Sequence, residues 1–323
     1  MKILHTALEY NYGEKRRKLG KRSKKIMIVK LKGGLGNQMF QYAMARAVAY
    51  RSNLPLKLDM EYFENGGLHQ YRLGHFNIIE DFATEDDIKQ FKPSRKQTIA
   101  FAIYKIKEKF SPWYDWRKKT VIKERSFLFN PDILKIRGSV YLDGYWQSEK
   151  YFADISHIIR CEFTIKYEPN SANRQILKKI DDTNSVSLHV RRGDYATNPK
   201  TLQMHGVLSL DYYMNALDLI SEKIKEPHIF IFSDDIFWVK KNLKSALPLY
   251  FVEHNGKGQD YEDLRLMSRC KHHIIANSSF SWWGAWLSEN PHKIVIAPNQ
   301  WFSEERMKKM GENDIIPKNW IKI

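Results

Sequence analysis

The stretch that decides the fold class reads Val186-Ser-Leu-His-Val-Arg-Arg-Gly-Asp194. Val186, Leu188 and Val190 alternate with other residues as they do in a buried β-strand, and Gly193 allows a turn. The apolar run then ends abruptly in charged side chains. The stretch therefore predicts a strand whose carboxyl end carries the chemistry of the protein.

Outward from this strand, strand-like and helix-like segments alternate to the end of the chain. The predicted strands are Ser185–Val190, His228–Phe232, Leu249–Val252, His272–Ala276 and Lys293–Ala297, and the helices between them are Leu210–Ile224, Ile236–Leu243, Tyr261–Arg269 and Ser279–Ser288. Such alternation favours a parallel sheet covered by helices on both faces. Sheets of this kind bind ligands at the carboxyl ends of their strands.

The first half of the chain is less regular. Its elements are strand-like Ile26–Leu31, a glycine-rich turn at Lys32–Gln38, helix-like Met39–Tyr50, strand-like Leu54–Leu58 and Ser139–Asp143, and helix-like Ala83–Phe91 and Ile99–Phe110. Because single cores stop growing at about 250–300 residues, a chain of 323 residues predicts two domains. We place these domains at 27–180 and 181–323, after a basic and flexible N-terminal extension at 1–26.

The composition indicates a globular protein, with 43% hydrophobic and 13% aromatic residues. Cys161 and Cys270 lie far apart, which is typical of reduced thiols and a cytoplasmic protein. The net charge is +16, but residues 1–25 hold nine Lys or Arg and two Glu. This head has no apolar core of a secretory signal, and no run of about 18 apolar residues occurs. The head either binds anionic lipid or nucleic acid, is solvated, or reflects a start site upstream of the true one at Met27.

The two adjacent arginines, Arg191 and Arg192, require an explanation. Guanidinium groups at the end of a buried strand are costly to desolvate unless an anion meets them. The planar donors of arginine suit phosphate or carboxylate. The pattern therefore indicates either a phosphate site or a structural Arg–Asp pair.

The turn Lys32-Gly-Gly-Leu-Gly-Asn-Gln38 opens a helix after a strand. Its glycines allow close approach of a ligand, and a helix amino terminus favours an anion or a polar sugar. The spacing matches neither the dinucleotide fingerprint nor a P-loop. The alternative is a tight turn with Asn37 as the helix cap, and Asn37 can serve both roles.

A second polar turn, Asn277-Ser-Ser-Phe-Ser-Trp-Trp-Gly-Ala-Trp286, follows another predicted strand. Its hydroxyls and the backbone N–H groups of a helix start can hold a phosphate. Trp282, Trp283 and Trp286 share one helical face with Ser279, so we expect them to pack in a core or between domains.

A third polar turn, Ser233-Asp-Asp235, can bind ribose or guanine, or can cap a helix through Ser233 or Asp234. Metal chemistry is not expected. The chain has no Asp-x-Asp pair, and His272 and His273 point to opposite faces of a strand.

Four motifs together carry a resemblance: Gly33–Tyr42, Gly144-Tyr-Trp-Gln-Ser-Glu-Lys-Tyr-Phe152, His189-Val-Arg-Arg-Gly-Asp194 and Asn277–Gly284. In order and spacing the chain resembles the bacterial α-1,2-fucosyltransferases of glycosyltransferase family 11, from about Met27 to its end. The first 26 residues lie outside these motifs.

The resemblance implies an α/β, GT-B-like fold with two Rossmann-type domains facing a central cleft, and GDP-fucose bound mainly by the second domain. It implies inverting transfer of L-fucose to the 2-hydroxyl of a galactose-type acceptor, with no metal and no cofactor. The expected acceptor is a galactoside-containing oligosaccharide or a lipid-linked glycan. The expected location is cytoplasmic, with peripheral contact at the inner membrane face.

The resemblance also assigns residue roles. The expected catalytic residues are Arg191, Arg192, Asp194 and Asn37, and the expected donor-binding residues are His189, Arg192, Asp263, Asn277, Ser278, Ser279, Phe280, Gly34 and Gly36. Of the two arginines, Arg192 is the first candidate to reach the diphosphate, with Arg191 as the second. Asp263 is expected near guanine or ribose. Asp194 either acts as the general base or orients the arginines.

Three alternatives stay open at this point. The first is a GDP-fucose-dependent transferase of other regiochemistry, and the second is an inactive sugar-nucleotide binder. The third is a nucleic-acid-binding protein, which a pI of about 9.5 and the aromatic and basic stretch 113–119 favour. The acceptor contacts are expected from residues 60–135, where loop variation changes specificity.

Overall fold

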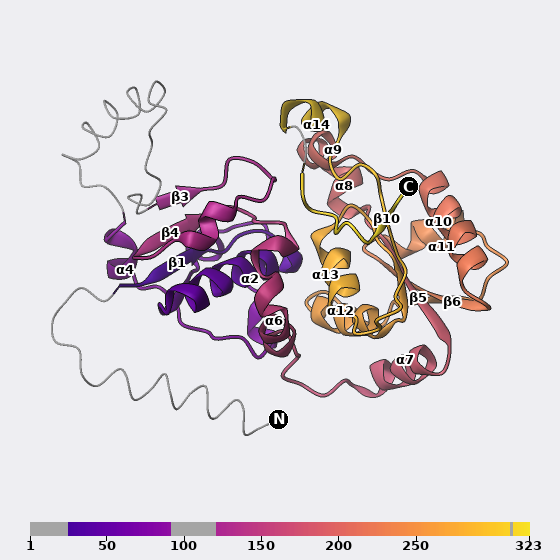
Figure 1. The fold of residues 1–323 in the computed structure, drawn as a ribbon. Helices are drawn as coiled ribbons and strands as arrows, with labels where there is room; N and C mark the ends of the chain where they lie inside the picture. Colours follow the sequence, from indigo (N-terminus) through magenta and orange to yellow (C-terminus); the bar gives the residue numbers. More distant parts are fainter. Residues whose placement is uncertain (1–24, 92–120, 311–312) are drawn as a thin grey trace.

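Two parallel β-sheets lie side by side in the computed structural model, which describes residues 25–91, 121–310 and 313–323 (Figure 1). The first sheet has the order β2-β1-β4-β3 and the second β10-β9-β8-β5-β6-β7. The strands are β1 (Met27–Lys30), β2 (Leu56–Asp59), β3 (Val121–Lys123), β4 (Val140–Asp143), β5 (Asn184–Val190), β6 (Pro227–Ser233), β7 (Leu249–Phe251), β8 (His272–Ile274), β9 (Val295–Ala297) and β10 (Ile321–Lys322). Every pairing between these strands is parallel. The α/β, GT-B-like prediction with two Rossmann-type halves is confirmed.

Helices cover both faces of the second sheet, as the alternation predicts. Ile229 and Ile231 of β6 belong to the apolar cluster under α10 (Leu210–Lys223) and α11 (Ile236–Asn242). Phe230 and Phe232, the residues between them, belong to the cluster under α12 (Asp260–Arg269) and α13 (Ser279–Leu287). Successive side chains of a strand point to opposite faces, so a nearly continuous apolar strand is buried on both sides.

The first sheet is shorter and follows the same rule. Met27 and Val29 belong to the main core, whereas Ile26 and Ile28 face a small separate cluster. The other helices are α2 (Leu35–Ser52), α3 (Glu61–Glu64), α4 (Glu85–Lys89), α6 (Ser156–Glu162), α7 (Ser171–Asp181), α8 (Gly193–Thr197), α9 (Pro199–His205) and α14 (Glu304–Met310). The predicted helix 83–91 is shorter, because Thr84 and Asp87 form a capping box at its start. The predicted helix 99–110 lies outside the described residues.

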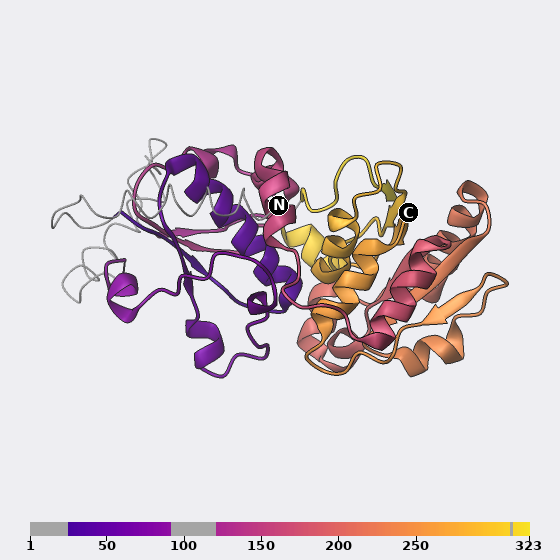
Figure 2. The same ribbon diagram turned by 90° about the horizontal axis from the view of Figure 1, so that it is seen from below.

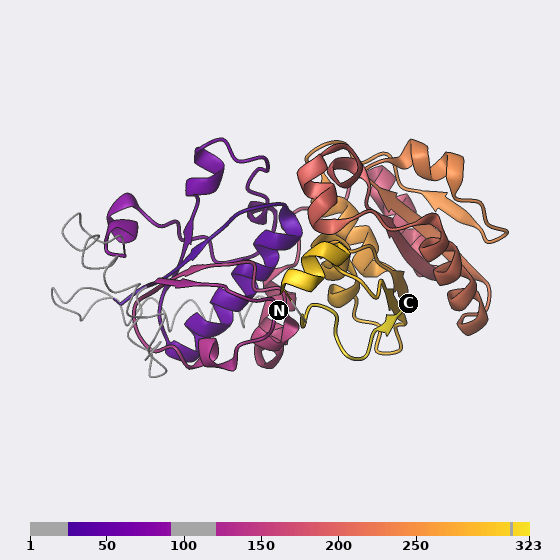
Figure 3. The same ribbon diagram turned by 90° about the horizontal axis from the view of Figure 1, so that it is seen from above.

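One aromatic core joins the two halves. Phe40 of α2 packs against Trp282 and Trp283 of α13, with ring centroids 4.4 and 5.0 Å apart, and Phe152 stacks on Trp283 at 5.4 Å. Trp282 and Trp283 are fully buried. The two halves meet where α2 packs against α13, as the views from below and from above show (Figures 2 and 3). The tryptophan face is therefore packing between the halves, as predicted.

The predicted domain limits follow the two sheets only approximately. Helix α7, which a boundary at 180 assigns to the first domain, packs against α12 and β5 of the second half (Figure 1). Of the predicted extension 1–26, only Lys25 and Ile26 are described, so its flexibility stays a prediction. No helix in the described part of the chain is long and apolar enough to cross a membrane.

Candidate functional site

The start of α2 and the start of α13 touch at Gly36. A Cβ atom on Gly36 would lie 2.4 Å from the carbonyl carbon of Ser279 and 2.5 Å from the nitrogen of Phe280. The indole Nε1 of Trp283 donates to the carbonyl oxygen of Gly36 at 3.0 Å. The glycine at this position therefore lets two backbones meet, and its predicted contact with a donor stays a prediction.

Asn37 connects the same two helices through its side chain. Its Oδ1 accepts a hydrogen bond from Nε2 of Gln147 at 2.7 Å and another from Oγ of Ser279 at 3.0 Å. Helix α2 begins at Leu35 with Gly34 at the N-cap, so the interpretation of Asn37 as the cap is wrong. The Asn37 side chain is instead part of a link between the halves.

Both helices begin without a side-chain cap. Gly34 has no side chain, and Ser278 at the start of α13 makes no capping hydrogen bond within the described structure. Neither first turn contains an acidic residue. Because a helix amino terminus carries about half a positive charge and free N–H groups, two such ends beside each other form a site that favours an anion.

Asp234, from the polar turn Ser233-Asp-Asp235, fixes the turn after β5. Its carboxylate accepts the backbone N–H of Arg192 at 2.9 Å and lies 3.1 Å from Nη1 of Arg191. A Cβ atom on Gly193 would lie 2.3 Å from Oδ2 of Asp234. A side chain at position 193 would therefore displace this carboxylate from its place beside the turn.

The two arginines have different surroundings. The guanidinium of Arg191 lies 5.2 Å from the ring centroid of Tyr195, whose hydroxyl donates to the carbonyl oxygen of Asn277 at 3.4 Å. The guanidinium of Arg192 instead lies 3.7 Å from the ring centroid of Trp238, and its Nε is 3.5 Å from Asp235. Both arginines thus have the Arg–Asp pairing that was one of the two interpretations. Only Arg191 is also connected to the polar turn 277–280, through Tyr195.

The two carboxylates of the Ser233-Asp-Asp235 turn bind different backbone groups. Asp235, and not Ser233 or Asp234, is the N-cap of α11, because its Oδ1 accepts the backbone N–H of Trp238 at 3.2 Å. Ser233 accepts the backbone N–H of Asp235 at 3.0 Å. The expectation of a cap by Ser233 or Asp234 is wrong, because the cap lies one residue after Asp234.

His189, near the end of β5 and just before Arg191 and Arg192, is buried against α13. Its ring lies 5.6 Å from that of Phe280, edge to face, and only 4% of the residue is exposed. Burial lowers the pKa of His189 to about 4. A neutral imidazole is therefore present at physiological pH.

Asn277 and Ser278, which precede α13, are nearly buried. The Asn277 side chain donates to the carbonyl oxygens of His205 and Trp301, at 2.9 and 3.4 Å, and its Oδ1 accepts from no described protein group. The structure thus brings together His189, Arg191, Asn277, Ser279, Phe280 and Asn37 where the carboxyl ends of β1, β5 and β8 meet.

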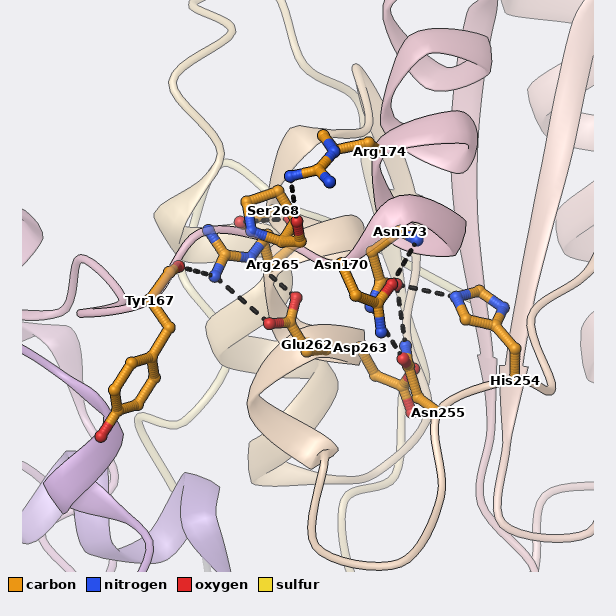
Figure 4. A network of polar contacts seen from close by, with 11 residues as sticks. Tyr167, Asn170, Asn173, Arg174, His254, Asn255, Glu262, Asp263, Arg265 and Ser268 are labelled. Atoms are coloured by element: carbon orange, nitrogen blue, oxygen red, sulfur yellow. Dashed lines mark hydrogen bonds and ion pairs between the residues drawn. The ribbon is translucent and has the colours of Figure 1, made fainter.

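Asp263 belongs to a different network, on α12 (Figure 4). It accepts from Nδ2 of Asn255 at 2.8 Å, and Asn255 also pairs with Asn173 of α7. His254 lies 2.8 Å from Oδ1 of the same Asn173. Burial raises the pKa of Asp263 to about 7. Its expected role near guanine or ribose stays a prediction.

Two expected features, the general base and independence of metal, stay predictions. The side chain of Asp194, at the start of α8, lies outside the described part. In residues 25–91, 121–310 and 313–323, no three His, Cys, Asp or Glu side chains gather as metal ligands. Independence of metal stays a prediction.

Comparison with known proteins decides the family of this chain. The model of glycosyl transferase family 11 matches residues 2–323. The chain belongs to glycosyltransferase family 11. The match begins at residue 2, so it includes residues 2–26, which the four motifs leave outside.

Two bacterial relatives of this family 11 chain span nearly its whole length, and a mouse relative spans about four fifths of it. The α-1,2-colitosyltransferase of Escherichia coli is 36% identical over 305 residues, covering 92% of this chain and 99% of the relative. The O-antigen biosynthesis glycosyltransferase WbnK of Escherichia coli is 35% identical over 310 residues, covering 91% of this chain and 99% of the relative. The mouse galactoside 2-α-L-fucosyltransferase Sec1 is 25% identical over 270 residues, covering 81% and 64%.

A solved structure with a similar chain course is the NodZ α-1,6-fucosyltransferase soaked with GDP-fucose. It has a TM-score of 0.47 and 15% sequence identity, and the match covers 85% of this chain and 95% of NodZ. The family makes this protein a glycosyltransferase, whereas its donor sugar, acceptor and linkage require separate arguments.

Proposed function

We propose that this family 11 glycosyltransferase transfers L-fucose from GDP-fucose to the 2-hydroxyl of a galactose-type acceptor glycan, with inversion and without a metal. The observation that carries the proposal is the contact of two uncapped helix starts at Gly36 and Ser279. Arg191 is connected to the same turn through Tyr195, whose hydroxyl donates to Asn277. This arrangement favours a diphosphate. Membership of a glycosyltransferase family disfavours the alternative of a nucleic-acid-binding protein.

The reaction moves negative charge onto the departing nucleotide. The bond between the anomeric carbon and the β-phosphate oxygen breaks, the acceptor oxygen attacks from the opposite face, and the hydroxyl proton goes to a base. Donors placed at the phosphate stabilise the transition state more than the ground state. We assign this role first to Arg191 and the N–H groups at the start of α13. Arg192 is the second candidate for this role, because its guanidinium stacks on Trp238. Asp194 stays the candidate base.

A second donor is favoured by a specific observation. The 36% identical relative is named an α-1,2-colitosyltransferase. Colitose is L-fucose without its 3-hydroxyl, so a site that accepts one sugar differs from a site for the other by the contacts to a single group. The α-1,2 linkage is common to that name and to the name of the mouse relative.

The test is a transfer assay with purified protein, GDP-fucose or GDP-colitose, and a panel of β-galactosides, followed by linkage analysis of the product. We expect a 1,2-linked product whose rate is unchanged by EDTA. A product with another linkage supports the alternative of other regiochemistry. Binding of GDP-fucose without transfer or hydrolysis, for every acceptor, supports the inactive binder.

The acceptor is expected to be an oligosaccharide or a lipid-linked glycan, and binding to anionic vesicles would test peripheral membrane contact. Residues 60–135, from which acceptor contacts are expected, are described only at 60–91 and 121–135. A lipid-linked galactoside used more efficiently than the free oligosaccharide would support the membrane-side expectation.

A further inference from the structure

The motif Gly144-Tyr-Trp-Gln-Ser148 has no role in the proposed function so far, yet it forms a strained turn beside the helix junction. Trp146 has a φ of 56°, in the left-handed region that bulky residues rarely adopt. The carboxylate of Glu124 accepts the backbone N–H groups of Tyr145 and Trp146, at 2.6 and 2.9 Å. Ser148 N–H closes the turn onto the carbonyl oxygen of Trp146 at 2.8 Å. Such strain persists only where the surroundings hold it, and it is common at functional sites.

This turn delivers Gln147 to Asn37. The turn leaves the carboxyl end of β4, which neighbours β1 in the sheet, and β1 leads into α2. Gln147 is 8% exposed, and its Nε2 donates to Oδ1 of Asn37 at 2.7 Å. Ser279 of the other half donates to the same oxygen at 3.0 Å. The Oδ1 atom of Asn37 therefore receives two donors from two halves of the molecule.

Two donors on Oδ1 determine what Asn37 presents to a ligand. A carboxamide has one acceptor oxygen and one NH₂ group with two donors. With the oxygen occupied, the NH₂ group lies over Gly33, where an added Cβ atom would be 2.8 Å from Nδ2, and no described protein group accepts from it. Asn37 is half-buried at the junction of the two uncapped helix starts, so its NH₂ group adds two more donors to a site that already favours an anion.

We propose that Gln147 is a positioning residue of the transfer reaction: it holds the carboxamide of Asn37 so that the NH₂ group faces the oxygens of the bound donor. This inference rests on the proposed function and names a group in the same site. Asn37 makes the contact, and Gln147 acts through it. As the sugar leaves, the fixed NH₂ group stabilises the charge that develops on the phosphate, which is an effect on kcat more than on KM.

The experiment is a double-mutant cycle with Gln147→Met and Asn37→Ala, read as kcat and donor KM in the transfer assay. The methionine keeps the size of glutamine and removes its hydrogen bonds. We expect each single variant to lower kcat at least tenfold with donor KM changed less than threefold, and the double variant to equal Asn37→Ala. A kcat of Gln147→Met within twofold of the wild type, or additive losses in the double variant, would overturn the proposal.

Two controls separate positioning from a structural role. Ser148→Ala changes the same turn without a contact to Asn37, and its kcat should stay within twofold of the wild type. Gln147→Glu offers only acceptors to Asn37, which favours a rotated carboxamide with its oxygen toward the donor. Its kcat should therefore fall further than that of Gln147→Met, with a circular dichroism spectrum and Tm close to those of Gln147→Met.

If Gln147→Glu were as active as the wild type, the proposal would be wrong even if Gln147→Met did not fold. If wild-type protein transfers no fucose or colitose to any acceptor, the proposed function fails instead, so the two failures are distinguishable.

Discussion

The turn between β1 and α2 and the turn between β8 and α13 are alike in position and different in chemistry. Each joins a parallel strand to a helix that has no side-chain cap and no acidic residue in its first turn. The first turn is built of glycines and the second of Asn277, Ser278 and Ser279. Gly36 allows contact with the second turn, whose hydroxyl and amide groups supply the polar atoms. The comparison shows that the glycines of the first turn make room for the polar side chains of the second turn, and that Asn37 is the polar side chain that the first half adds.

The largest effect on kcat should come from Arg191, the arginine on the side of this junction. Arg191→Ala removes a donor that faces the wall made by Tyr195 and Asn277, and we expect kcat to fall about 10²–10³-fold. Arg192→Ala, which removes a side chain stacked on Trp238, should cost less than about tenfold on the same reasoning. Steady-state kinetics with saturating acceptor measure both. The opposite ranking would move the diphosphate toward Trp238 and away from the junction.

Away from the junction, Asp263 should control how stability depends on pH. Its folded pKa is about 7, raised by burial above the usual value of 3.8. Between these two values the unfolded chain releases the proton and the folded protein keeps it, so the wild type loses stability as pH rises from about 4 to 7. Asp263→Asn removes that loss, which amounts to up to about 4 kcal/mol at 1.36 kcal/mol per pKa unit.

Urea unfolding of wild type and Asp263→Asn at several pH values tests this prediction. The two curves should converge near pH 4 and separate up to about pH 7, with the variant more stable. Equal pH dependence of the two proteins would show that the Asn255 hydrogen bond keeps the carboxylate ionised.

Close contact at the junction makes Gly36, in the first turn of α2, different from Gly34, the N-cap of the same helix. Gly36→Ala places a Cβ atom 2.4 Å from the Ser279 backbone, so the two turns must separate, at a cost of about 1–3 kcal/mol. Gly34→Ala is the matched control, because its Cβ would meet only the His69 ring at 3.7 Å and its φ is −72°. Thermal unfolding should give a lower Tm for Gly36→Ala than for Gly34→Ala. Similar Tm values for both would contradict the contact.

A smaller effect is expected from the indole hydrogen bond across the junction. Trp283→Phe removes the donor to the Gly36 carbonyl at 3.0 Å, and Trp282→Phe removes a donor to Ile315 within the second half at 2.8 Å. Each lost hydrogen bond should cost about 1 kcal/mol. Only Trp283→Phe should also weaken GDP binding, by a few-fold in a calorimetric titration. Equal GDP affinity of both variants would separate the junction from the nucleotide site.

The sequence predicts best what local periodicity controls. The two-faced strand β6 and the buried Trp282 face follow from periods of two and 3.6 residues. Strands β3 and β10, which lie at the edges of the two sheets, were not predicted. The contacts of Asp234 and Gln147 were not predicted, because their partners, Arg191, Arg192 and Asn37, are 42–110 positions away in sequence.

Caps were predicted less well than strands and helices. The cap expected at Asn37 lies at Gly34, and the cap expected at Ser233 or Asp234 lies at Asp235. In both turns several neighbouring residues can cap, and tertiary contacts decide which one does. The Asn37 side chain accepts hydrogen bonds from Gln147 and Ser279. The Asp234 carboxylate accepts the backbone N–H of Arg192. A residue that looks like a cap in sequence is therefore available for a contact between distant parts of the chain.

The most direct test of the junction as the diphosphate site is a crystal structure of the complex with GDP. The β-phosphate should lie within hydrogen-bond distance of the Asn37 NH₂ group and of the N–H groups that begin α13, with Arg191 as its nearest arginine. A β-phosphate bound to Arg192 beside Trp238, with Asn37 still facing away from it, would contradict this account.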